Sequence, residues 1–147
     1  MWREFGKFQT FNPFETGCKC TSVQYFPAPA NQFETKCSKW GLPIALNATL
    51  LPNATAGAGV FSEQFASFLP RNRLAIVDQG TLSTGEEYLV EFDCSVTFGV
   101  LSYCYHAFTA SGTASAALVA YVQKFAAVQG LNPHNLTWAV TDQQNCD

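Results

Sequence analysis

Segments that read as β-strands follow one another between residues 2 and 109, and turn-forming residues separate them. A run of consecutive antiparallel strands leaves two open edges unless the sheet closes on itself. The sequence therefore predicts an all-β fold, a single domain over residues 1–147 built as an eight-stranded antiparallel up-and-down β-barrel, which is wide enough for one small ligand. The eight predicted strands are 2–9, 20–26, 33–40, 44–51, 59–68, 74–77, 87–94 and 101–109.

One amphipathic helix is predicted after the last of these strands, from Ala114 to Gln129. Ser111 or Thr113 can cap its start, and Gly130 stands where a helix commonly ends in a left-handed residue. Its larger apolar residues form a single stripe that would pack on the outer wall of the barrel: Leu118, Tyr121, Val122, Phe125 and Val128. A short strand within residues 136–140 can follow.

Charge and hydropathy exclude two kinds of partner. The net charge is −3, and no cluster of Lys and Arg provides a basic surface for nucleic acid or anionic lipid. No apolar run approaches the roughly 20 residues that span a bilayer, so we expect no membrane insertion. Only 13% of the residues are charged and 14% are aromatic, which leaves apolar surface that can line a cavity.

Cysteines and glycosylation signals together favour an oxidising, extracellular compartment. The chain has six cysteines, an even number, and three Asn-x-Thr sequons at Asn47, Asn53 and Asn135. The first residues carry charges and do not resemble a signal peptide, so we expect that a leader has been removed or left out. The sequence predicts a secreted, disulfide-bonded glycoprotein.

Several motifs resemble those of the lipocalins, closest to the apolipoprotein D branch with its crustacyanin and bilin-binding-protein relatives. Trp2-Arg3-Glu4 is similar to the family's Trp-x-Glu signature, the segment 17–25 (GCKCTSVQY) to the second strand, and 74–78 (LAIVD) to the strand that ends in the Asp of the second motif. The closing TDQQNC of residues 141–146 resembles the C-terminal tail. Residues 109–111 (TAS) depart from the Arg or Lys that the family places there. The resemblance implies a secreted lipocalin β-barrel around a lipophilic molecule.

Cys20 and Cys146 are the pair that the resemblance implies as a disulfide. The other four cysteines allow three connectivities, and the local one joins Cys18 to Cys37 and Cys94 to Cys104 because each pair brackets a turn. Strand alternation opposes the second of these pairs unless a bulge intervenes, since Cys94 falls in phase with inward residues and Cys104 does not. Both outcomes stay open.

The expected binding residues are those on the predicted inward phases of the strands. Tyr25 and Phe65 match pocket positions of the apolipoprotein D group, and Glu4 is a candidate polar group near the base of the barrel. A solid core made by the same rings is the alternative reading. The predicted ligand-binding set is Thr21, Val23, Tyr25, Phe61, Phe65, Tyr88, Val90, Phe92, Tyr103 and Tyr105.

The predicted function is extracellular binding and transport or sequestration of a small hydrophobic ligand, held without a covalent bond. Retinoid, carotenoid, bilin, steroid and fatty acid all fit, and a carotenoid or bilin pigment is the first expectation because flat rings suit a flat ligand. No catalytic or metal-binding residue is predicted, and His106 is expected outside the barrel with His134 in a loop. The alternatives are an isomerase-like or de-epoxidase-like lipocalin enzyme using Cys18 or Cys37, and a ligand-free protein-interaction module; homo- and hetero-oligomers both stay open.

Overall fold

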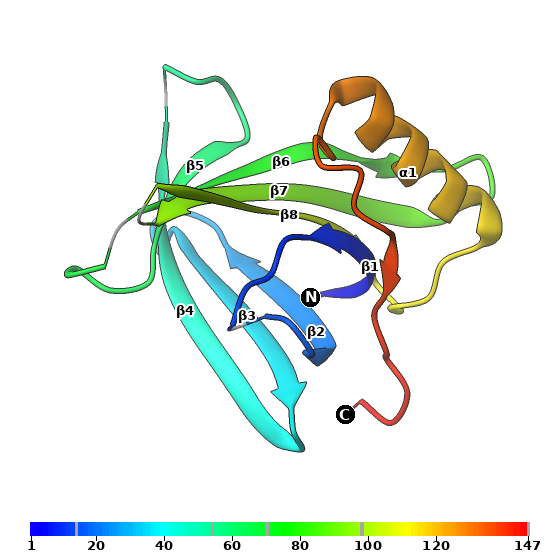
Figure 1. Ribbon diagram of the computed structural model, residues 1–147, viewed down its shortest axis with the longest axis horizontal. Helices are drawn as coiled ribbons and strands as arrows, with labels where there is room; N and C mark the ends of the chain where they lie inside the picture. Colours follow the sequence, from blue (N-terminus) through cyan, green and yellow to red (C-terminus); the bar gives the residue numbers. More distant parts are fainter. Residues whose placement is uncertain (14, 54, 70, 98, 147) are drawn as a thin grey trace.

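A closed β-barrel with one helix on its outer wall forms the part of the chain that the computed structural model describes, residues 1–13, 15–53, 55–69, 71–97 and 99–146 (Figure 1). The predicted fold is confirmed. No helix among the described residues is both long and apolar enough to cross a membrane. The elements in chain order are β1 (Trp2–Gln9), β2 (Lys19–Phe26), β3 (Gln32–Lys39), β4 (Leu42–Pro52), β5 (Val60–Gln64), β6 (Asn72–Thr81), β7 (Glu87–Thr97), β8 (Val100–Thr109), α1 (Ala116–Gln129) and β9 (Ala139–Val140).

The first strand closes the barrel. Each strand from β2 to β8 pairs with its neighbour in sequence, and β1 pairs with both β8 and β2, so the sheet retains no open edge between them. The ladder between β1 and β8 shifts register between Glu4 and Gly6. Such a bulge bends the strand, as closure requires. The tail then adds β9 beside β1 (Figure 1).

Two strands, β5 and β6, differ most from the sequence prediction. β5 ends at Gln64 instead of residue 68, and β6 runs from Asn72 to Thr81 instead of residues 74–77. Residues 79–81, predicted as turn, continue the ladder opposite Glu87–Leu89. Pairing across β6 and β7 therefore overrides the weak strand propensity of Gly80, and the turn is confined to the residues that follow Thr81.

Helix α1 begins two residues later than predicted. Ser115 is its N-cap and accepts a hydrogen bond from the Leu118 amide, whereas Ser111 and Thr113 lie before the helix. Gly130 ends it in the left-handed conformation, as predicted. Val128, placed in the apolar stripe by the sequence, is 71% exposed, and Ala126 is buried in its place beside Leu118 and Val122.

Two disulfides anchor the start of β2. Cys18 bonds Cys37 of β3, and Cys20 bonds Cys146 in the tail. The predicted Cys94–Cys104 bond is wrong, and both thiols are free. Cys94 pairs with Tyr103 across the ladder and Cys104 pairs with Asp93, so the two sulfurs leave the sheet on opposite faces.

Gly6 should tolerate no side chain. A Cβ at this position would lie 2.3 Å from the ring of Trp138. We expect Gly6→Ala to lower the free energy of unfolding by about 1–3 kcal/mol, the usual cost of overpacking. Gly80→Ala is the control, because its Cβ would meet only the end of the Tyr88 side chain, at 3.2 Å. Equal denaturant midpoints for the two variants would contradict the close contact.

The tail disulfide should be the stronger of the covalent constraints. Its cysteines are 126 residues apart, and the entropy lost by the unfolded chain predicts about 4–5 kcal/mol of stabilisation. We expect a Cys20→Ala, Cys146→Ala double variant to lose most of this in denaturant titrations, and Cys94→Ala, which removes a free thiol, to lose little. Thiol titration of the unfolded, unreduced protein should find two thiols; none would show that Cys94 and Cys104 are bonded after all.

Candidate functional site

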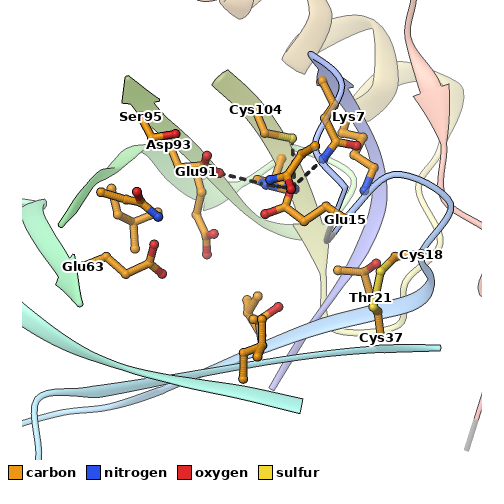
Figure 2. Close-up of a pocket in the computed structure, with 18 of the residues that line it drawn as sticks. Lys7, Glu15, Cys18, Thr21, Cys37, Glu63, Glu91, Asp93, Ser95 and Cys104 are labelled. Atoms are coloured by element: carbon orange, nitrogen blue, oxygen red, sulfur yellow. Dashed lines mark hydrogen bonds and ion pairs between the residues drawn. A yellow bond between two sulfur atoms is a disulfide. The ribbon is translucent and has the colours of Figure 1, made fainter. Parts of the chain in front are cut away.

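The barrel encloses a cavity of about 430 Å³ (Figure 2), within the range of small-molecule sites. Most of its wall is apolar, and the Cys18–Cys37 disulfide borders it. The apolar side chains come mainly from β2 to β6 and from the end of β8: Val23, Phe33, Ile44, Leu46, Phe65, Leu69, Leu74 and Phe108.

Charged and polar side chains form the opposite part of the wall. Alternate residues of β7 and β8 point inward, which follows from the two-residue period of a strand. Glu63 of β5, Lys7 of β1 and Glu15 before β2 complete this polar wall. The polar inward residues of β7 and β8 that line the cavity are Glu91, Asp93, Ser95, Ser102, Cys104 and His106.

Five of the predicted binding residues lie on the inner side of the barrel. Thr21, Val23 and Phe65 line the cavity. Tyr25 packs on the inner core and donates its hydroxyl hydrogen bond to the Glu91 carboxylate, and Phe61 packs on the same core without being part of the cavity wall. Whether these residues contact a ligand stays a prediction.

The predicted inward phase of β7 and β8 is wrong for Tyr88, Val90, Phe92 and Tyr105. These side chains belong to the core between the barrel and helix α1. The Tyr105 hydroxyl donates to the Val122 carbonyl oxygen at 2.7 Å. An outer helix requires an apolar sheet face beneath it, and the aromatic side of these strands supplies that face.

Tyr103 borders the cavity, but its ring packs outward. The ring stacks on Phe92 with centroids 5.9 Å apart, and its hydroxyl donates to Asn132 at 3.1 Å. His134 packs on the same ring from the loop in which the sequence placed it. Tyr103 therefore ties the segment after α1 to β8.

His106 is buried inside the barrel, contrary to its predicted place outside. Its Nδ1 lies 2.5 Å from Glu4 Oε1, and its Nε2 lies 3.0 Å from Asp93 Oδ2. Burial opposes protonation of the ring, but nearby Cys104 and the hydrogen bonds to Asp93 and Glu4 raise its pKa well above the ordinary value. The imidazolium thus joins β8 to carboxylates on β1 and β7.

Glu4 is fully buried yet ionised. Burial alone would raise the pKa of its carboxyl, but hydrogen bonds from His106 and Thr141 and the charge of Lys7, whose Nζ is 3.2 Å away, lower it to about 2. Glu4 is thus the structural member of the Trp-x-Glu motif. The sequence suggested it only as a candidate polar group at the base.

Glu63 and Glu91 have the opposite electrostatic character. Burial, together with the nearby charge of Asp93, raises the pKa of Glu63 to about 8. Burial also raises the pKa of Glu91 to about 7, although His106 and the Tyr25 hydroxyl partly offset it. Both carboxyls face the cavity, and among the described residues neither forms an ion pair.

Potential metal ligands and a potential nucleophile meet at His106. Ligand atoms of Glu15, Cys104 and His106 lie within 4.8 Å of one another. Both imidazole nitrogens already bind carboxylates, and burial raises the pKa of the Cys104 thiol to about 12. The group is therefore arranged as a protonated hydrogen-bond network, without the free base that activates a cysteine. Cys18 and Cys37, the predicted enzyme candidates, are bonded to each other.

One pattern in the sequence could have predicted the inner polar wall. Glu91 and Asp93 share a phase on their strand, and Cys104 and His106 share the facing phase on the next. The sequence prediction directs the aromatic side of these two strands toward the ligand, which assigns the polar side to the exterior. The need for an apolar face under the helix would have reversed the assignment.

Glu63 should make the protein less stable as pH rises. The pKa of Glu63 is about 8 in the folded state and about 4.5 in the unfolded state. Between these two pH values the folded state keeps a proton that the unfolded state has lost. The free energy of unfolding therefore falls as pH rises across this interval, by up to about 1.4 kcal/mol per pH unit. Glu63→Gln stays neutral, so its free energy of unfolding should overtake that of the native chain between about pH 5 and pH 9.

The exposed Glu87 supplies the control for this measurement. Glu87→Gln should follow the pH dependence of the native chain throughout. Parallel stability curves for Glu63→Gln and the native chain would show that Glu63 ionises normally in the folded state.

Comparisons with known proteins identify the fold. No protein-family model and no curated protein sequence matches this chain. Among solved structures, lobster apocrustacyanin A1 is 20% identical, with a TM-score of 0.65 over 98% of this chain and 76% of the lobster chain. Insecticyanin from the tobacco hornworm Manduca sexta is 14% identical, with a TM-score of 0.70 over 99% and 79% of the two chains. A dog lipocalin allergen is 12% identical, with a TM-score of 0.65 over 99% and 95%. Membership of the apolipoprotein D branch stays a prediction. The comparisons show that the protein has the lipocalin fold.

Proposed function

We propose that this protein binds one small, largely apolar molecule inside its barrel and carries or sequesters it outside the cell. The observation that carries the proposal is the cavity of about 430 Å³ inside the closed barrel, because most of its wall is apolar. Burial of a ligand's apolar surface there supplies affinity at roughly 25 cal/mol per Å² before the costs of binding are subtracted.

The extracellular location is part of the same proposal. Two disulfides, one of them closing nearly the whole chain, suit an oxidising compartment. Asn47 and Asn135 are exposed, as glycosylation requires, and Asn53 is half-buried; Ala54 of its sequon lies outside the described residues. Occupancy of the three sequons stays a prediction.

The ligand class is narrower than the sequence alone suggested. The sequence favours a flat pigment because it predicts four inward aromatic rings on β7 and β8, but Tyr88, Phe92 and Tyr105 lie under α1. Phe33, Phe65 and Phe108 are the phenylalanine rings on the cavity wall, and Tyr103 only borders it. A non-covalent carotenoid or bilin remains a candidate, and the carboxyl groups of Glu63 and Glu91 disfavour a fatty-acid carboxylate beside them.

A bulky residue at the apolar wall should block binding. Leu46 and Leu42 lie on the same strand, and only Leu46 lines the cavity. We expect a neutral fluorescent naphthylamine probe to bind the native chain at about micromolar concentration, near −8 kcal/mol. Leu46→Trp should weaken this binding by about tenfold or more, since it fills the space that the probe needs.

Leu42→Trp is the matched control and should bind the probe as the native chain does. If neither the probe nor retinoid, carotenoid, biliverdin or steroid binds the native chain, the carrier proposal fails. If Leu42→Trp and Leu46→Trp weaken the probe equally, binding occurs outside the cavity.

A further inference from the structure

More acidic than basic side chains line the cavity. Glu15, Glu63, Glu91 and Asp93 line it together with the cationic Lys7 and His106. Lys36 also reaches the cavity wall, but its ammonium group is 2.7 Å from Glu34 and half exposed.

The cationic side chains on the cavity wall already bind other carboxylates. Lys7 binds Glu4, and His106 binds Glu4 and Asp93. Among the described residues, Glu63 and Glu91 form no ion pair: Glu91 accepts a hydrogen bond from Tyr25 and is acted on by the charge of His106, and Glu63 interacts with Asn72.

Glu63 and Glu91 converge on one place. They come from β5 and β7, and Figure 2 shows their carboxyl groups pointing into the same part of the cavity. Glu63 is 5% exposed and Glu91 is 2% exposed, so water screens them weakly. Two such groups repel each other when both are ionised, and a cation between them would remove that repulsion.

A second observation is an unsatisfied polar group elsewhere on the cavity wall. Thr21 lies on the wall beside the Cys18–Cys37 disulfide (Figure 2) and is 7% exposed, and its Oγ1 has no hydrogen-bond partner in the part of the chain that the structure describes. A buried hydroxyl group without a partner costs free energy, and a native structure normally satisfies it. A ligand atom in the cavity would do so.

We propose that the ligand is an organic amine, whose protonated nitrogen lies between Glu63 and Glu91 and whose apolar body covers the wall formed by Phe33, Phe65 and Leu74. This inference rests on the proposed function, because it names the ligand class of the same cavity. An ammonium group offers donors to two carboxylates at once, and a charge-assisted hydrogen bond in a dry site is stronger than a neutral one.

The proposal predicts a pH dependence of its own. An alkylammonium, like lysine, stays charged to about pH 10, whereas Glu63 and Glu91 hold protons near neutrality in the empty protein. Amine binding must release those protons, so amine affinity should rise from about pH 6 to about pH 9. The groups that face the two carboxyls are Glu4, Glu15, Tyr25, Asn72, Asp93 and His106.

Three ligands that share one decyl chain test the head group. Decylamine, decanol and decanoate should be titrated calorimetrically, below their aggregation concentrations, into the native chain. We expect decylamine to bind about tenfold or more tightly than decanol at about pH 8.5, and decanoate to bind most weakly. Proton release with decylamine, measured in buffers of different ionisation enthalpy, should be absent with decanol.

Variants locate the effect at the two carboxyl groups. Glu63→Gln and Glu91→Gln should each remove most of the preference for decylamine and leave decanol affinity within about twofold, which also shows that the variants fold. Glu87→Gln, on the same strand as Glu91, should behave as the native chain. Because two variants are used, a folding failure of one leaves the other decisive.

The outcomes separate the two proposals. If decanol and decylamine bind equally, or decanoate binds best, the amine inference is overturned while the carrier proposal stands. If both glutamine variants keep the native preference for decylamine, the assigned carboxyls are wrong and the inference fails. If none of the three ligands nor the naphthylamine probe binds, the carrier proposal fails as well.

Discussion

The rest of the structure depends on the interactions of the Glu4 carboxylate. This carboxylate is fully buried. It binds His106 of β8 and Lys7 of its own strand, and it accepts a hydrogen bond from Thr141 in the tail. An isolated buried carboxylate is costly, and removal of one partner of a buried pair leaves an uncompensated charge. The same residue therefore holds the closing strand, the last barrel strand and the C-terminal tail together, and it orients His106 so that Nε2 reaches Asp93 at the cavity wall.

β8 is buried on both faces, and each face has a separate task. Tyr105 and Ala107 point outward into the core that anchors α1, whereas Cys104, His106 and Phe108 point inward to the cavity. Helix α1 thus covers much of the aromatic surface of β7 and β8, which is therefore not available to a ligand. This division explains why the cavity is less aromatic and more polar than the composition of the chain suggests.

The chemistry of the polar wall suits recognition better than catalysis. Cys104 is protonated at neutral pH, and His106 is held between two carboxylates, so neither acts as a free nucleophile or base. Glu63 and Glu91 are neutralised by protons instead of by cations, which makes the cavity responsive to the charge of whatever enters it. In the proposed amine site, a hydrophobic wall beside two such carboxyls would distinguish ligands by head group as well as by shape.

The sequence by itself determined the barrel, the outer helix and the tail disulfide. Turn residues between short strands, the stripe on α1 and the Trp2, Cys20 and Cys146 motifs are local signals, and the structure contains each of the predicted features. Only the tertiary structure decided which face of β7 and β8 lines the cavity. Because β8 is buried on both sides, alternation of polar and apolar residues could not tell inside from outside, and the packing of Leu118 and Val122 on the aromatic face settled it. The groups that meet at Glu4 come from the charged residues 7 and 106 and from the hydroxyl group of residue 141, a proximity that only the closed barrel creates.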